Sequence, residues 1–208
     1  EPEGINMPGD WNGWQNPPTA NLALASSTQV SGGRVIKIST GITRWQTSFS
    51  VAASGGDLTG SSYGWLFTSG GGNPWGNKWA NVNVTMNTLQ DYTKEGASNN
   101  SITIVNGKWY TMNWEDKGYQ NTRAIFMETS AQPVELSSVS VPGTVAANQP
   151  ATISLTTSTT PAAEELFYLL YTTNNWVTSA ITSFTMTENT RTATIPGQSP
   201  GAVVKYYA

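Results

Sequence analysis

Short segments rich in β-branched and aromatic residues recur along the chain, and each is bounded by Gly, Asn, Ser or Pro. Several of these segments alternate apolar and polar residues, as half-buried strands do. No window of helical length repeats apolar residues at the spacing of a helix. The pattern therefore predicts an all-β chain. In its first part we expect strands at residues 34–40, 45–53, 63–69, 81–87, 101–105, 108–115 and 123–129.

The dipeptide Asn106-Gly107 lies between two of the expected strands. Asn and Gly tolerate the positive φ angles of a two-residue turn, and Asn-Gly is the strongest short signal for a β-hairpin. We therefore expect residues 101–105 and 108–115 to form a hairpin.

The composition changes near Pro133. Eight of the nine tryptophans precede this proline, and Thr, Ser, Ala and Val dominate after it. Proline cannot donate to a β-ladder and often marks the edge of a domain. We therefore expect two domains, residues 1–132 and 133–208. In the second domain we expect strands at residues 134–141, 151–157, 165–173, 181–187, 191–197 and 202–208.

The strand spacing of residues 133–208 is typical of an immunoglobulin-like or fibronectin-type sandwich. Such domains usually need about 100 residues, so this domain is short and is expected to be truncated. The last segment also ends within an expected strand. Two explanations follow. The first, which we favour, is that the sequence is a piece of a longer polypeptide; the second is that a partner strand completes the sandwich.

Charged residues make up only 11% of the chain, and the net charge is -3. Binding to a nucleic acid depends on clustered Lys and Arg, and the sequence has no such cluster, so we expect no nucleic-acid partner. No apolar run approaches the roughly 20 residues of a membrane helix, so we expect no membrane insertion. A Cys-free, Thr- and Asn-rich, Lys-poor composition suits an exported bacterial protein.

The sequence contains no cysteine and no histidine. This excludes thiol and histidine catalysis and zinc sites built from these residues. Glu115 and Asp116 are adjacent, so on a strand they would point to opposite faces instead of forming the facing pair of a glycosidase. Asp57 lacks the alternating oxygen ligands of a calcium loop. We expect no enzyme activity, no metal and no cofactor.

Tryptophan is the strongest functional signal in the sequence. Trp11, Trp14, Trp75 and Trp79 lie in stretches that contain Gly, Asn or Pro instead of within apolar runs, which favours exposed rings. A sugar ring offers an apolar C–H face and a rim of hydroxyl groups. Aromatic rings flanked by amides match both features, as in pockets that combine apolar surface with a few polar groups.

Residues 69–83 contain the best candidate site. Trp75 and Trp79 would stack on sugar rings, while Asn73, Lys78 and Asn81 would bind the hydroxyl rim. An alternative is a long glycine-rich hairpin whose two rings fold back on the core.

Residues 7–18, MPGDWNGWQNPP, are similar to the G-D-[FW]-N-G-W opening of the β-sandwich modules that accompany amylases and branching enzymes and bind starch or glycogen. They also resemble the openings of starch-binding outer-membrane lipoproteins of Bacteroidota. In those modules the closing Trp often packs against the sandwich. The resemblance therefore implies a structural Trp14 and leaves Trp11 as a further candidate sugar contact.

The stretch YTTNNWVTS, followed by TATIPGQSPGAVVKYYA, resembles sandwich domains of secreted modular proteins of Bacteroidota, which commonly leave the cell by the type IX route. Asn174 stands where that pattern usually has Asp, which argues against metal or charge chemistry there. Trp176 is expected to cap its own sandwich. The resemblance implies architecture and a secreted or cell-surface location.

Two functional hypotheses for these residues remain; a third, that they are accessory modules of an enzyme whose catalytic domain lies beyond residue 208, is compatible with the first of them. The leading one is a non-catalytic extracellular protein that binds a polysaccharide, such as the α-glucan starch. The alternative is a structural or adhesive module that associates with itself or with a surface protein by strand addition, because the final strand would be left open.

Overall fold

The computed structural model describes residues 4–18, 34–39, 42–70, 72–187 and 190–208. The described residues form sixteen strands and one short 3-10 helix, η1 (Asp10–Asn12), so the all-β prediction is confirmed. The chain forms two compact units, Glu1–Gln132 and Pro133–Ala208. We call them unit 1 and unit 2 and describe each by itself.

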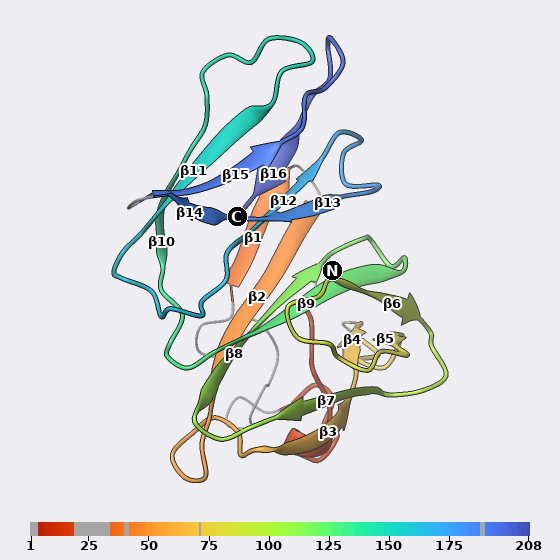
Figure 1. Ribbon diagram of the computed structural model, residues 1–208. Coiled ribbons are helices and arrows are strands. Elements are labelled where there is room, and N and C mark those ends of the chain that lie inside the picture. The colour runs from red at the N-terminus through yellow and green to blue at the C-terminus, as the bar shows by residue number, and fades with distance from the viewer. Residues whose placement is uncertain (1–3, 19–33, 40–41, 71, 188–189) are drawn as a thin grey trace. The chain divides into compact units, whose positions relative to one another are not determined.

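Unit 1 contains a seven-stranded antiparallel sheet and a separate two-stranded ribbon, as Figure 1 shows. The sheet has the order β1-β2-β8-β9-β6-β5-β4, and the ribbon pairs β3 with β7. The strands of the sheet are β1 (Arg34–Ser39), β2 (Ile42–Val51), β8 (Lys108–Glu115), β9 (Thr122–Thr129), β6 (Gln90–Lys94), β5 (Asn77–Ala80) and β4 (Phe67–Ser69). The strands of the ribbon are β3 (Ser61–Trp65) and β7 (Asn100–Ile104).

The core of unit 1 is an aromatic cluster contributed by both the sheet and the ribbon. Trp65 from β3 lies at its centre: its ring is 4.5 Å from Phe67 and 5.4 Å from Phe126, both in edge-to-face geometry. Alternation along β8 sends Tyr110, which packs against Phe49, into the same core. Aromatic side chains bury large areas, so this cluster holds the sheet and the ribbon together.

Several strand predictions in unit 1 are wrong. The single strand expected at residues 63–69 is two strands, β3 in the ribbon and β4 in the sheet, and β5 and β6 were not predicted. Residues 81–87 form no strand, although apolar and polar residues alternate there; only Asn83 makes an isolated bridge, to Ser101. Asn106 and Gly107 do form a turn, but the strands on either side do not pair, because β7 pairs with β3 while β8 pairs with β2 and β9. The local turn signal is present, and the long-range pairing overrides the hairpin it predicted.

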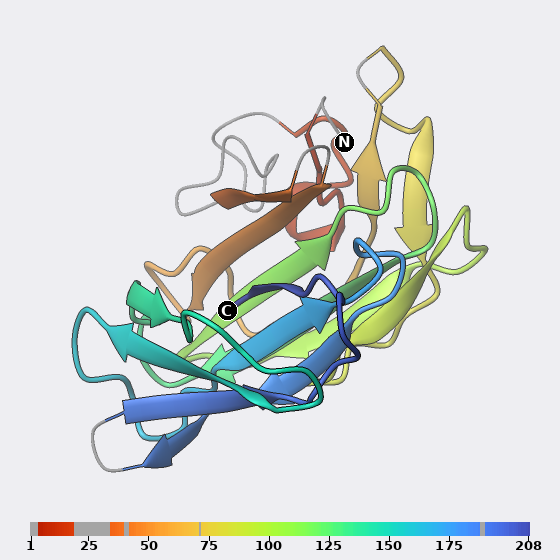
Figure 2. The ribbon, with the colours of Figure 1, turned by 90° about the horizontal axis from the view of Figure 1, so that it is seen from above.

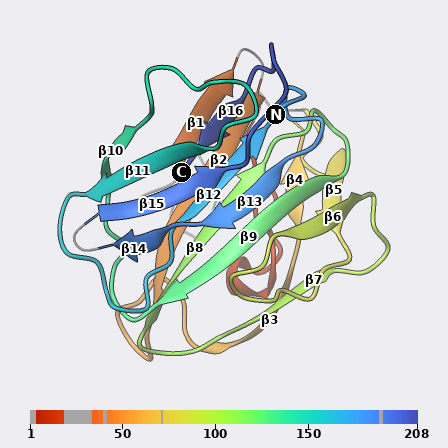
Figure 3. The same ribbon diagram turned by 45° about the horizontal axis from the view of Figure 1, so that its top comes forward.

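Unit 2 consists of a four-stranded sheet, β10-β11-β15-β14, and a three-stranded sheet, β13-β12-β16 (Figure 3). Its core joins the two sheets, because Ile153 and Ile195 from the first pack with Leu169 from the second. The strands are β10 (Leu136–Ser140), β11 (Ala151–Thr157), β12 (Tyr168–Thr172), β13 (Ala180–Ser183), β14 (Thr185–Thr187), β15 (Thr190–Ile195) and β16 (Lys205–Tyr207).

The strand order of unit 2 is that of an immunoglobulin-like sandwich. In chain order, β10, β11, β14 and β15 take the places of strands A, B, D and E, which form one sheet. Strands β12 and β16 take the places of C and F in the other sheet, and β13 adds a strand beside C. The single strand predicted at residues 181–187 is in fact two, because the chain crosses between the sheets at Phe184.

Candidate functional site

Trp75 is the only aromatic residue in the exposed class among the described residues, with 43% of its surface accessible. It lies in the connection between β4 and β5, whose tip projects from the rest of unit 1 (Figure 2). Soluble proteins normally cover a ring of this size, so its exposure marks a candidate contact surface.

Hydrogen bonds fix the backbone around Trp75. The side-chain oxygen of Asn73 accepts a hydrogen bond from the Trp75 N–H at 3.3 Å, and the Asn73 carbonyl oxygen accepts one from the Gly76 N–H at 2.8 Å. Asn73 thus forms the local turn that its side chain favours. Gly70 has a φ of +148°, and a Cβ there would collide with the Asn73 carbonyl oxygen. The connection closes because position 70 is glycine.

Asn16 ties the opening segment of the chain to this turn. Its side-chain amide nitrogen donates a hydrogen bond to the Pro74 carbonyl oxygen at 2.8 Å, and its side-chain oxygen accepts one from the Thr68 hydroxyl at 3.1 Å. The two bonds hold β4 and the turn against residues far away in sequence. Asn16 was not predicted as a site residue; its only signal in the sequence is its place two residues after the G-D-W-N-G-W motif.

Lys78 and Trp79 alternate along β5, so they point to opposite faces of the hairpin. Lys78 pairs with Thr68 across the hairpin and is half-buried. Its backbone exchanges hydrogen bonds with Glu95, through the Lys78 N–H and the Lys78 carbonyl oxygen. The side chain therefore starts from a fixed backbone, two residues after the turn that carries Trp75.

The prediction that Trp79 stacks on a sugar is wrong, because its side chain is completely buried. Its ring lies 5.3 Å from Trp114 in edge-to-face geometry, and its indole N–H donates to the Gln120 carbonyl oxygen at 2.7 Å. Trp79 lies opposite Phe67 in the β4–β5 pair and shares the core face of the sheet. Of the two rings predicted for the site, only Trp75 is accessible.

Asn81 is exposed but has a structural task. It follows the last residue of β5, at the opposite end of the strand from Trp75. Its φ is +70°, and its side-chain oxygen accepts a hydrogen bond from the Ser98 N–H at 2.8 Å. A Cβ at Gly96 would lie 2.7 Å from the Asn81 amide, so the two residues pack closely. The structure does not bring Asn81 together with Trp75. The prediction that Asn81 contacts the same sugar as Trp75 is therefore wrong.

The structure contradicts one of the two roles that the resemblance implied for the tryptophans of the opening motif, that of Trp11 as a sugar contact. Trp11 packs against the core, with its ring 5.4 Å from Tyr63 and 5.7 Å from Trp65, and its indole N–H donates to the Met7 carbonyl oxygen at 2.8 Å. Trp14 is half-buried, and its indole N–H donates to the Asp10 carboxylate at 2.9 Å. Trp11 is the anchor of this motif, and it is not retained as a sugar contact.

Asp57, considered for calcium binding, and Glu115, considered for catalysis, are both engaged in structural contacts. Asp57 accepts hydrogen bonds from the Ser50 N–H and hydroxyl at 2.7 and 2.9 Å. Buried Glu115 forms ion pairs of 3.1 Å with Arg123 and 3.4 Å with Lys117. Within the described part of the chain, no three carboxylates gather into a group that could hold a metal ion.

The described residues contain no helix that is long and apolar enough to cross a membrane. Comparisons of the chain with protein-family models, with curated proteins and with solved structures found no match. The similarity of residues 7–18 to starch-binding modules therefore rests on the motif itself.

Proposed function

We propose that unit 1 is a non-catalytic module that binds a polysaccharide, an α-glucan such as starch, and that it acts outside the cell. The observation that carries the proposal is the exposed ring of Trp75 on a turn that Asn16, Asn73 and Gly70 fix in place. The motif at residues 7–18 supports the same ligand class. It also supplies Asn16, which steadies the turn.

The ring of Trp75 would take the apolar face of one sugar unit. The side-chain nitrogen of Asn73 has no hydrogen-bond partner in the described part of the chain, so it is available as a donor to a hydroxyl group. Lys78 would contribute its ammonium group to the same rim. Because the turn is held by its own hydrogen bonds, binding does not have to pay for ordering it.

The magnitude of this contact points to a polymeric ligand. Covering the accessible 43% of the Trp75 side chain would bury on the order of 100 Å². At about 25 cal/mol per Å², this contributes roughly 2.5 kcal/mol. A dissociation constant of about 1 mM already needs about 4 kcal/mol. We therefore expect weak binding to single sugars and measurable binding to chains that present many equivalent units.

The binding should also be insensitive to salt. The proposed contacts are a ring on a C–H face and hydrogen bonds to uncharged hydroxyl groups. Neither contact involves a charged ligand, so screening by salt should leave the binding affinity unchanged.

A depletion assay on insoluble starch tests the proposal. The 208-residue chain should be retained and the Trp75→Ala variant should be recovered in the supernatant. Val105→Ala is the matched control, because Val105 is an apolar residue of unit 1 that is 48% exposed and lies away from this turn. Equal retention of the Trp75→Ala variant, or no retention of the parent chain, would contradict the proposal.

A further inference from the structure

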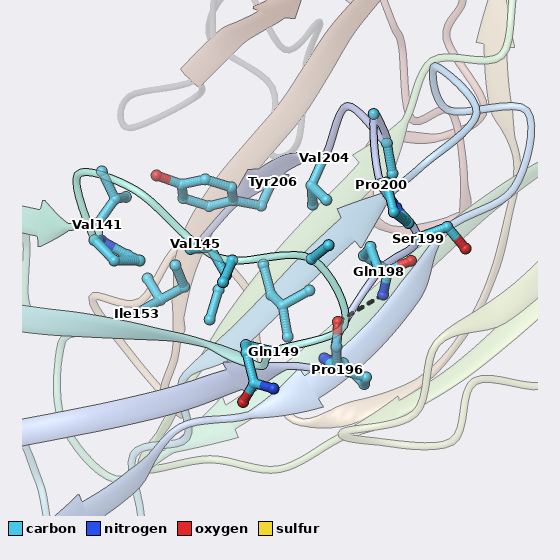
Figure 4. A pocket seen from close by; sticks show the side chains of 17 residues that line it. Val141, Val145, Gln149, Ile153, Pro196, Gln198, Ser199, Pro200, Val204 and Tyr206 are labelled. Carbon is cyan, nitrogen blue, oxygen red and sulfur yellow. Dashed lines mark hydrogen bonds between the residues drawn. The ribbon is translucent and has the colours of Figure 1, made fainter.

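A pocket of about 310 Å³ in unit 2 has little to offer a sugar. Figure 4 shows Val141, Val145, Ile153 and Val204 among the side chains that line it, and none of its lining residues carries a charge. The hydroxyl rim of a sugar needs hydrogen-bond donors and acceptors, so this pocket does not extend the sugar site. Charged groups that could serve hydroxyl groups lie in unit 1, close to Trp75.

Lys78 and Glu95 are neighbours across the sheet of unit 1. Trp79 lies opposite Lys94 in the β5–β6 pair, and the same register places Glu95 opposite Lys78. The Glu95 N–H donates a hydrogen bond to the Lys78 carbonyl oxygen at 2.8 Å. Partners across a pair of strands lie on the same face of the sheet. The two opposite charges are therefore side by side.

The backbone of Glu95 has a conformation that favours other residues. Its φ is +56°, in the left-handed region, which suits glycine or asparagine because a longer side chain crowds the backbone there. Oε1 of Glu95 accepts a hydrogen bond from the Lys78 N–H at 3.3 Å, where a regular ladder would use a backbone carbonyl oxygen. Such conformations concentrate at binding sites, so we infer a role for this side chain beyond the turn.

The side chains of Lys78 and Glu95 do not pair with each other. Among the described residues, the Lys78 ammonium group makes no hydrogen bond or ion pair, and the Glu95 carboxylate makes one hydrogen bond, through Oε1. An ammonium group has only donors, and a carboxylate has only acceptors. The surface thus presents unused donors beside an unused acceptor.

A hydroxyl group of a sugar satisfies both partners at once. It can donate its hydrogen to the Glu95 carboxylate while its oxygen accepts from the Lys78 ammonium group. Hydrogen bonds to charged groups are stronger than those between neutral groups, and a group that donates and accepts strengthens both bonds. Trp75 precedes Lys78 by three residues, a span of at most about 11 Å. A short sugar chain stacked on Trp75 can therefore reach the pair.

Glu95 also affects which sugars the site accepts. Lys78 alone would attract a polysaccharide that carries carboxylate groups. Glu95 cancels that charge, and a carboxylate of an acidic sugar would lie beside a like charge. A neutral sugar meets no such repulsion. Repulsion of the wrong ligand is one of the two ways in which a binding site becomes specific.

From these observations we propose that Glu95 is a specificity-determining residue of the sugar site. Together with Lys78 it binds a hydroxyl group of a neutral polysaccharide, and it disfavours polysaccharides that carry carboxylates. This inference rests on the proposed function of unit 1. The two can fail separately, because Trp75 could bind starch without any contribution from Glu95.

The test compares retention on insoluble starch with retention on the same starch after its primary hydroxyl groups have been oxidised to carboxylates. The parent chain should prefer neutral starch. Glu95→Gln keeps an oxygen that can accept from the Lys78 N–H, so the turn is preserved. This variant should bind neutral starch severalfold more weakly. It should bind oxidised starch severalfold more tightly than the parent does, and high salt should remove that gain.

Glu135→Gln is the matched control, because it makes the same change in net charge at an exposed position of unit 2. It should keep the parent's preference. The double variant Lys78→Gln/Glu95→Gln should lose the gain on oxidised starch. An unchanged preference in Glu95→Gln, or an equal gain in Glu135→Gln, would overturn the inference and leave the proposed function standing. A parent chain that neutral starch does not retain would overturn both.

Discussion

The side-chain amide of Asn16 donates a hydrogen bond of 2.8 Å to the carbonyl oxygen of Pro74, across 58 residues of sequence. This bond joins the opening motif to the turn that carries the exposed ring of Trp75. It gives a physical reason for two separate tryptophan-containing stretches to act together: the first supports the turn, and the second presents the ring.

Replacing Asn16 with Ala should therefore reduce binding to starch without removing the contact residue. The variant loses the hydrogen bonds to Pro74 and Thr68, each of which stabilises the fold by about 1 kcal/mol. The turn becomes free to move, so the entropic cost of ordering it is added to the free energy of binding. The affinity for starch should therefore weaken severalfold. Depletion on insoluble starch measures the effect. Gln15→Ala, at the exposed neighbouring position, should bind as the parent does, and unchanged binding by Asn16→Ala would contradict the supporting role.

Trp75 and Trp79 should differ sharply in their contributions to stability. Trp79→Ala removes a completely buried ring and should lower the free energy of unfolding by about 3–5 kcal/mol. Trp75→Ala removes an exposed ring and should change it by no more than about 0.5 kcal/mol. Urea unfolding monitored by circular dichroism gives both values. Similar losses in the two variants would mean that Trp75 also belongs to the core.

Gly9 should not tolerate a side chain, although its backbone is extended. A Cβ at this position would lie 2.6 Å from the Trp65 Cβ and 2.7 Å from the Gly64 carbonyl oxygen. Gly9→Ala should therefore lower the free energy of unfolding by about 1–3 kcal/mol, as overpacking does. Gly72→Ala is the control, because no atom of the described residues lies within 4 Å of a Cβ there. Thermal unfolding of the two variants would show whether the opening motif packs as closely as described.

Tyr92 should limit stability at alkaline pH. Its hydroxyl group is buried and has no hydrogen-bond partner in the described part of the chain, and burial raises the pKa of this phenol far above its usual value. Burial likewise raises the pKa of Tyr110, to about 12. The unfolded chain would ionise both phenols near pH 10 while the folded chain keeps their protons. Their contribution to stability is therefore full below pH 10 and is lost as the pH rises above it.

Tyr92→Phe should reduce the loss of stability above pH 10. It removes the ionisable group and also an unsatisfied buried hydroxyl, so it should raise the free energy of unfolding at pH 7 by about 1 kcal/mol. Urea unfolding at pH 7 and between pH 10 and 11 checks both effects. A variant that is less stable than the parent at pH 7 would show that the hydroxyl has a partner after all.

The strands that were predicted well are those whose apolar positions in the sequence coincide with the side chains that the strand buries. The expected bounds of β8 and β11 agree with the structure residue for residue, because each contributes alternate side chains to a core and is rich in β-branched or aromatic residues. Residues 81–87 have an equally regular pattern and form no strand. Val82 is buried although residues 81–87 form no β-ladder. Alternation of apolar and polar residues alone therefore does not determine whether a segment pairs with a neighbouring strand.

The candidate site was predicted in part. The glycine- and asparagine-rich context suggested that both Trp75 and Trp79 were exposed, but β5 begins at Asn77 and carries Trp79 into the core opposite Phe67. Sequence neighbours could not reveal that partner, since it depends on the pairing of β4 with β5. The bond between Asn16 and Pro74 is likewise a long-range contact that no local pattern encodes.

The most direct test of the sugar site follows the indole N–H signals of the labelled chain during titration with maltoheptaose. The signal of Trp75, assigned with a Trp75→Phe variant, should shift progressively, while the indole signals of Trp79 and Trp114, both completely buried, stay in place. Raising the salt concentration should leave the titration curve unchanged. A Trp75 signal that does not move at tens of millimolar sugar, or a shift confined to other tryptophans, would contradict the account.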